Sequence, residues 1–173
     1  MKSLFSPKSE RVLRVLLVNP GRSWKTRPLA REARVSLGQV SNVRKKLLDR
    51  EWLVETSDGI VLSEPDTLTE EWSRNYSFRR NTSFDFYSMM ETGEIEIAIA
   101  NMCDKQGVRY GLTGFSAAAR IAPSVRYQRV MVYLDTGVEN IARKLGFKKV
   151  DSGANVSILE PYDEGVYYGG QKK

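Results

Sequence analysis

The segment from Ser36 to Leu47 constrains the fold of this chain more than any other. Ser36 is followed three residues later by Gln39, which is the spacing of a capping box at the start of a helix. Val40, Val43 and Leu47 then recur at helical spacing and share one face. A helix that is apolar on one side packs that side against a core and leaves the other side open. The opposite side carries Gly38, Ser41, Asn42 and Lys45, with Arg44 and Lys46 flanking it.

Two further helices and a hairpin are predicted around this segment. The first helix begins at Pro7, a residue that suits a first helical turn, and ends at the Asn-Pro-Gly break of residues 19–21. The second helix is predicted over residues 27–33. After the central segment, Asp58-Gly59 is a strong hairpin signal between two short apolar strands. Residues 1–64 are therefore expected to form one domain.

The small and apolar positions of this domain follow a demanding spacing. They are Leu29, Ala30, Ala33, Val35, Ser36, Val40, Ser41, Val43 and Leu47. This pattern resembles the helix-turn-helix of bacterial winged-helix regulators. The resemblance implies that the open face of the third helix enters the major groove of double-stranded DNA. The alternative is a domain of the same shape that is used only for protein contact.

Candidate DNA contacts follow from that resemblance. Asn42 can read an adenine edge in the major groove, while cations and helix N-terminal amides hold phosphates. The loop between the first two helices adds Arg22, Lys25 and Arg27, which border the DNA backbone in a winged helix or are simply solvated charges. The candidate DNA-binding residues are Arg22, Lys25, Arg27, Ser36, Gly38, Gln39, Ser41, Asn42, Arg44, Lys45, Lys46 and Ser57.

The distribution of charge supports the same half of the chain. The 173 residues carry a formal net charge of +6. Residues 1–80 hold 16 lysines and arginines against 10 acidic residues, whereas residues 81–173 hold 11 of each. A basic excess confined to one half is typical of a polyanion binder, although a basic surface without a partner has the same composition.

Composition excludes several classes of chemistry. The chain contains no histidine, which removes Ser-His-Asp and Cys-His catalysis and histidine metal sites. Its one cysteine, Cys103, excludes an intramolecular disulfide framework and a cysteine-rich zinc site. No apolar run is long enough to span a membrane, and residues 1–7 do not resemble a signal peptide. We expect a cytoplasmic protein with no cofactor.

The second half is expected to be a separate domain. Residues 65–82 are predicted to be a connecting helix and linker that Pro65 opens, and residues 83–173 an α+β domain. The expected elements are strands at 84–87, 109–114, 127–134, 147–150 and 155–159 and helices at 94–103, 115–121 and 138–145. The last two strands are expected to pair as a hairpin through residues 151–154. The fold class is therefore α+β, with an N-terminal winged helix-turn-helix and a small mixed α/β domain.

Several stretches of this second domain carry a closer resemblance. They are Arg109-Tyr110-Gly111-Leu112-Thr113-Gly114-Phe115-Ser116-Ala117-Ala118, Ala122-Pro123, Tyr133-Leu134 and Asn155-Val156-Ser157-Ile158-Leu159-Glu160-Pro161. With the first domain, they resemble AbiEi-family antitoxins, transcriptional regulators of type IV toxin–antitoxin systems. The resemblance spans residues 8–168. It implies autorepression through operator repeats, a C-terminal domain that serves antitoxicity and cooperative DNA binding, and a partner toxin similar to a nucleotidyltransferase.

Other interpretations of the chain remain at this point. Members of that family usually continue beyond the position of Tyr167-Tyr168, so the chain is expected to be a fragment or a short relative. The second domain could also be an interaction module for which the first domain is a scaffold. An active nucleotidyltransferase is not expected, because Asp135 is a single carboxylate where two should hold metal ions. Since one recognition helix reads a short half-site, the protein is expected to act as a dimer or as cooperative monomers.

Overall fold

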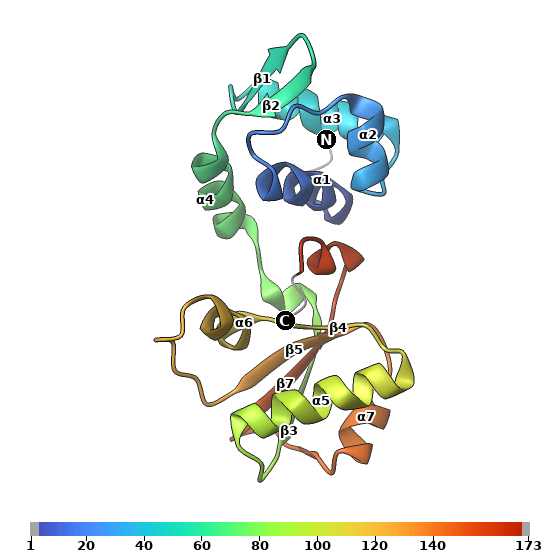
Figure 1. The fold of residues 1–173 in the computed structure, drawn as a ribbon, viewed down its shortest axis with the longest axis vertical. Helices are drawn as coiled ribbons and strands as arrows, with labels where there is room; N and C mark the ends of the chain where they lie inside the picture. The colour runs from blue at the N-terminus through green and yellow to red at the C-terminus, as the bar shows by residue number, and fades with distance from the viewer. Residues whose placement is uncertain (1–3, 171–173) are drawn as a thin grey trace. The chain divides into compact units, whose positions relative to one another are not determined.

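A computed structural model describes residues 4–170, and the chain divides into two compact units. The first unit comprises Met1–Ser77 and Asp163–Lys173, and the second comprises Phe78–Tyr162. Figure 1 shows the elements of both units. The outermost ends of the expected domains, residues 1–3 and 171–173, lie outside the described residues.

The first unit contains the predicted helices and hairpin. Its elements are α1 (Pro7–Val18), α2 (Thr26–Glu32), α3 (Leu37–Leu48), β1 (Leu53–Thr56), β2 (Gly59–Leu62), α4 (Pro65–Asn75) and the 3-10 helix η2 (Glu164–Tyr167). Pro7 begins α1 as expected, but the side chain of Ser6 does not cap the helix and bonds to Ser9 instead. Arg34, in the tight turn before α3, has a positive φ of 51°.

One apolar cluster holds these elements together. Leu13 and Leu16 of α1, Leu29 of α2 and Val40 and Leu47 of α3 are almost completely buried in it. The predicted apolar face of α3 is thus the face that packs. Its opposite face is left for solvent or a partner.

The hairpin is anchored by the chain that precedes α2. Trp24 N donates to Ile60 O at 2.8 Å, and Ile60 N donates to Trp24 O at 3.0 Å, so Trp24 forms a bridge beside β2. Gly59 has a φ of +140°, and a Cβ there would lie 2.4 Å from Trp24 O. Thr56 pairs with Gly59, so the loop residues are Ser57 and Asp58. Gly59 is therefore required by the close Trp24 backbone.

The division between the units differs from the expected boundaries. The predicted connecting helix is present as α4, but it packs on the first unit through buried Leu68 and half-buried Trp72. The C-terminal segment 163–170 also belongs to the first unit, where Tyr168 packs against the apolar cluster. The second unit thus ends at Tyr162, whereas residues 163–170 pack with the helices at the start of the chain.

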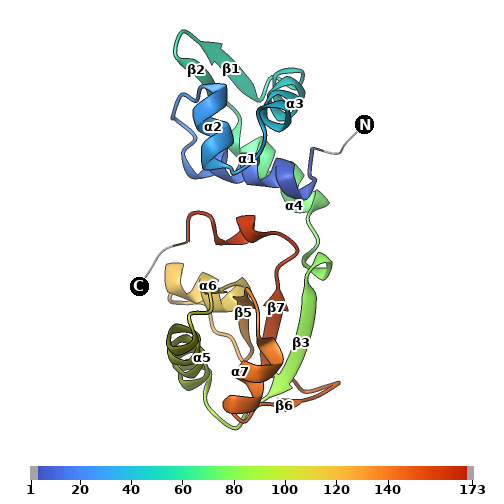
Figure 2. The ribbon, with the colours of Figure 1, turned by 90° about the vertical axis from the view of Figure 1, so that its right-hand side faces the viewer.

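The second unit is a five-stranded mixed sheet with helices, which confirms the α+β class. Its elements are η1 (Phe78–Arg80), β3 (Thr82–Tyr87), α5 (Thr92–Gln106), β4 (Tyr110–Leu112), α6 (Gly114–Ile121), β5 (Val130–Leu134), α7 (Val138–Lys144), β6 (Lys148–Lys149) and β7 (Val156–Glu160). The strand order is β4-β5-β7-β3-β6, and β5 and β7 are parallel. Helices α5 and α7 lie side by side over the sheet and share its apolar cluster (Figures 1 and 2).

The predicted hairpin between the last two strands is wrong. Both β6 and β7 pair with β3, which lies between them: Phe86 is opposite Lys149 on one side and Val156 on the other. The intervening residues pass around the end of β3, where Val150 N donates to Asp85 O at 3.2 Å and Asn155 N donates to Phe86 O at 3.1 Å. A turn signal between two strands does not exclude a third strand between them.

Cys103 lies in the core of this second unit, as a packed side chain on α5. Burial raises the pKa of its thiol to about 11. Among residues 4–170, no helix is long and apolar enough to cross a membrane.

Candidate nucleic-acid interface

The start of α3 is built as the sequence predicts. Ser36 has an extended backbone, and its Oγ accepts a hydrogen bond from Gln39 N at 3.2 Å. Beyond this cap, Gly38, Ser41 and Lys45 lie exposed, and Asn42 is half-buried. The predicted polar face of α3 is therefore not covered by the first unit itself.

Gln39 does not complete the capping box. Its Nε2 donates to Ser9 Oγ at 2.9 Å, and Ser9 is only 1% exposed on α1. The half of the capping box that Gln39 was expected to supply is thus wrong. Because its amide ties α3 to α1, Gln39 positions the helix rather than extending freely from its outer face.

Lys46 also differs from its expected place. It is 9% exposed and lies on the packed side of α3, and its backbone O accepts from Arg50 Nη1 at 2.8 Å. On the helix it lies between the buried Val43 and the half-buried Asn42, at the border of the packed face, and the packing of the first unit around this border covers it. Lys46 is therefore not part of the open face of α3.

Arg44 connects α3 to the hairpin. Its guanidinium is ion-paired with Glu55 of β1, and both side chains are partly exposed. Exposed pairs contribute about 0–1 kcal/mol, so this contact fixes the orientation of the hairpin more than it stabilises the fold. Part of the charge of Arg44 is balanced by Glu55, which makes it a weaker phosphate ligand than Lys45.

The loop before α2 brings further cations to the same unit. The Arg22 guanidinium lies 4.0 Å from the centroid of the buried Trp24 ring, a cation–π contact that restricts its position. Lys25 and Arg27 are exposed at the beginning of α2. Ser23 Oγ and Thr56 Oγ1 lie 3.3 Å apart and link this loop to the hairpin.

Ser57 lies at the tip of the hairpin. It is exposed beside Asp58, which is also exposed. Its hydroxyl is the candidate hairpin contact, and Asp58 places a negative charge next to it. The cations of the loop before α2 are therefore better placed to bind phosphate than the hairpin tip, where Asp58 repels it.

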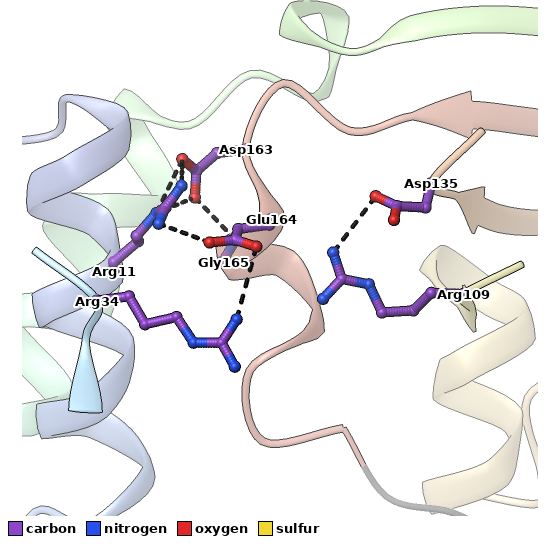
Figure 3. A network of polar contacts seen from close by, with 7 residues as sticks. All are labelled: Arg11, Arg34, Arg109, Asp135, Asp163, Glu164 and Gly165. Atoms are coloured by element: carbon purple, nitrogen blue, oxygen red, sulfur yellow. Dashed lines mark hydrogen bonds and ion pairs between the residues drawn. The ribbon is translucent and has the colours of Figure 1, made fainter. Parts of the chain in front are cut away.

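A second polar cluster of the first unit was missed by sequence patterns (Figure 3). Asp163 accepts from Arg11 Nε at 2.8 Å and from Arg11 Nη2 at 2.7 Å, and Glu164 accepts from Arg11 Nη1 at 2.8 Å. These carboxylates raise the pKa of Arg11. Asp163 also accepts from Gly165 N at 2.8 Å. The pair Asp163-Glu164 therefore holds Arg11 of α1 and acts as a clamp between the C-terminal segment and that helix.

Figure 3 also shows the carboxylate on which an enzymatic interpretation would depend. Asp135, in the second unit, is paired with Arg109 at 3.3 Å, and both side chains are exposed by about two-fifths. This pair joins the end of β5 to the residue before β4. It is a surface ion pair within the sheet.

Comparison with known proteins concerns mainly the second half of the chain. A family model described as "Transcriptional regulator, AbiEi antitoxin, Type IV TA system" matches residues 61–172. The match begins in β2 and continues through the second unit to the C-terminal clamp. Searches of curated proteins and of solved structures gave no match. The family expected from the sequence is confirmed by this match, and the chain belongs to the AbiEi antitoxins, transcriptional regulators of type IV toxin–antitoxin systems.

Proposed function

We propose that this protein is a sequence-specific DNA-binding repressor. The observation that carries the proposal is the uncovered polar face of α3, on which Gly38, Ser41 and Lys45 are exposed. Family membership supports a regulator, and the basic excess of residues 1–80 supports a polyanionic ligand. Duplex DNA offers both phosphates and base edges to such a surface.

The first unit is proposed to act as a winged helix. In this arrangement α1, α2 and α3 form the helical body, the β1–β2 hairpin is the wing, and Trp24 supplies a short third strand beside it. The α3 helix is then the recognition helix, whose first turns face base edges in the major groove. The tie between Gln39 and Ser9 and the pair of Arg44 with Glu55 keep α3 and the wing in register.

The candidate residues fall into three proposed roles. Asn42 and Ser41 contact base edges, because short polar side chains on the outer face can reach the groove. Arg22, Lys25, Arg27 and Lys45 contact phosphates, as do the amides that follow Ser36. Gly38 permits close approach, since no atom lies within 4 Å of a Cβ placed there. Arg44, Gln39 and Ser57 border this surface.

The regulatory role is proposed from the family. An AbiEi antitoxin that binds operator repeats beside its own coding sequence would repress its own synthesis. A single α3 reads a short half-site, so two copies bind the repeats as a dimer or as cooperative monomers. The second unit then serves antitoxicity toward a partner toxin that resembles a nucleotidyltransferase.

A charge reversal on α3 tests the proposal. Fluorescence anisotropy with duplex DNA from the region upstream of the coding sequence measures the affinity of the wild type, Lys45→Glu and Lys105→Glu. Lys105 is an exposed lysine in the last turn of α5 and serves as the matched control. We expect Lys45→Glu to weaken binding at least tenfold and Lys105→Glu to leave it within twofold, because only the first reversal repels phosphates at the interface. Equal affinity of the wild type and Lys45→Glu would show that α3 does not face DNA.

A further inference from the structure

Leu37 is an apolar side chain at the start of the side of α3 that carries Ser41 and Lys45. It is the first residue of the helix and is 47% exposed, although leucine is usually buried. The other large aliphatic side chains of α3 that point to the core, Val40, Val43 and Leu47, are at most 1% exposed. Leu37 therefore keeps nearly half of its surface outside the core of the first unit.

The position of Leu37 places it at the leading end of the candidate interface. Ser41 follows one turn later and Lys45 two turns later, so the three side chains form one stripe along the helix. Beside Leu37, the exposed Gly38 leaves open space where a side chain would stand. Leu37 is 47% exposed, and Ser41 and Lys45 are exposed as well, so the uncovered part of the Leu37 side chain can contact whatever α3 meets.

The chemistry of the major groove limits what an apolar side chain can recognise. Base edges there present hydrogen-bond donors and acceptors, and the one apolar group is the C5 methyl of thymine. Recognition helices contact bases with their N-terminal residues, which is where Leu37 lies. We infer, on the basis of the proposed function, that Leu37 is a specificity-determining residue that packs against a thymine methyl in the operator.

Replacing thymine by deoxyuridine tests this inference, because it removes that methyl and leaves every hydrogen-bonding group in place. Footprinting of the full chain on the upstream DNA first defines the protected site. Duplexes with one thymine at a time replaced by deoxyuridine are then titrated with the wild type, Leu37→Ala and Val18→Ala. Val18 is an exposed aliphatic residue at the end of α1 and serves as the control.

Replacement of one thymine per bound copy by deoxyuridine is expected to lower the affinity of the wild type about fourfold. This is the factor that corresponds to the burial of a single methyl group. Leu37→Ala should bind the thymine and deoxyuridine duplexes equally at that position, and Val18→Ala should keep the wild-type ratio. Thermal unfolding checks that both variants remain folded, as their exposure predicts. Wild-type binding without any preference for thymine, or an unchanged preference in Leu37→Ala, would overturn the inference alone. Failure of the wild type to bind the upstream DNA at all would overturn the proposed function and this inference together.

Discussion

At the scale of single residues, Asn42 and Lys45 can contribute differently to DNA binding. An amide side chain donates one hydrogen bond and accepts another, which matches an adenine edge, whereas an ammonium group is attracted to any phosphate. Asn42 is half-buried at the border of the open face, and Lys45 is exposed at its centre. We therefore propose that Asn42 acts on sequence preference and Lys45 on overall affinity.

Alanine substitutions separate the two roles. Asn42→Ala should relax the sequence preference at one base pair by roughly 1–3 kcal/mol. Lys45→Ala should weaken binding to all sequences and reduce the slope of log K against log salt concentration by about 1. Affinities measured on the operator and on single-base variants, at several salt concentrations, check both. If Asn42→Ala kept every base preference of the wild type, Asn42 would not contact a base.

Whether a residue is buried or exposed could be predicted from the sequence where helical spacing alone determines it. Val40 and Ser41 are adjacent in sequence, and their opposite environments follow from the period of the helix. Gln39 and Lys46 could not be placed in this way. The partner of Gln39 is Ser9, 30 residues earlier, and Lys46 is covered by packing around α3, so neither environment is encoded locally.

At the scale of elements, the hairpin depends on the loop beside it. The backbone of Trp24 bonds to Ile60 in both directions, and this close approach leaves no room for a side chain on Gly59. The β1–β2 hairpin is therefore attached to the helices of the first unit by backbone bonds as well as by the Arg44–Glu55 pair. Such an attachment keeps the hairpin at a fixed position relative to α3.

Gly59→Ala should destabilise the first unit. A Cβ would lie 2.4 Å from Trp24 O at a φ of +140°, and residues forced into such conformations cost about 1–3 kcal/mol before any steric clash is added. Gly38→Ala is the matched control, since its Cβ meets nothing within 4 Å and alanine favours the helix by about 0.5–1 kcal/mol. Urea unfolding of both variants measures the difference. A Gly59→Ala variant as stable as the wild type would contradict the described bridge.

Elements with strong local signals could be predicted, and their pairing could not. Gly107 and Gly146 both have positive φ values and follow helices close to the predicted ends. The predicted hairpin of β1 and β2 is likewise correct, because its two strands are neighbours in sequence and in the sheet. The same reasoning is wrong for β6 and β7. Strand β3, which ends at Tyr87, lies between them in the sheet, although it comes more than 60 residues before β6 in the sequence.

At the scale of the whole molecule, the chain leaves the first unit after Ser77 and returns to it at Asp163. The second unit is thus inserted into the first and is connected to it by two crossings of the chain. The returning segment is held by ion pairs of Arg11 with Asp163 and Glu164. In addition, Tyr168 Oη donates a hydrogen bond to Glu32 Oε1 at 3.0 Å. The last described residues are therefore part of the proposed DNA-binding unit.

Asp163→Ala should release this segment. The Asp163 side chain is 11% exposed and accepts charge-assisted hydrogen bonds from Arg11, so its loss should cost about 1.5–3 kcal/mol. Asp135→Ala removes the more exposed pair with Arg109 and should cost less than about 1 kcal/mol. Hydrogen exchange should show faster exchange over residues 163–170 in the first variant only. Unchanged protection of that segment would argue against the clamp.

This return could not be predicted from the sequence. Arg11 and Asp163 are separated by 152 positions, and no local sequence pattern around either residue indicates that they form an ion pair. The change in composition near residue 65 indicates that the chain has two parts, but not that the last residues rejoin the first. The family could be recognised because its motifs lie in continuous stretches of the second unit.

The entry of α3 into the major groove is tested most directly by methylation interference. Dimethyl sulfate methylates guanine at N7, which lies in the major groove, and adenine at N3, which lies in the minor groove. Upstream DNA methylated sparsely in this way is mixed with the full chain, and bound and free molecules are compared. We predict that N7-methylguanine is depleted from the bound DNA within the protected site. Depletion of N3-methyladenine alone would place the protein in the minor groove and contradict the assignment of α3.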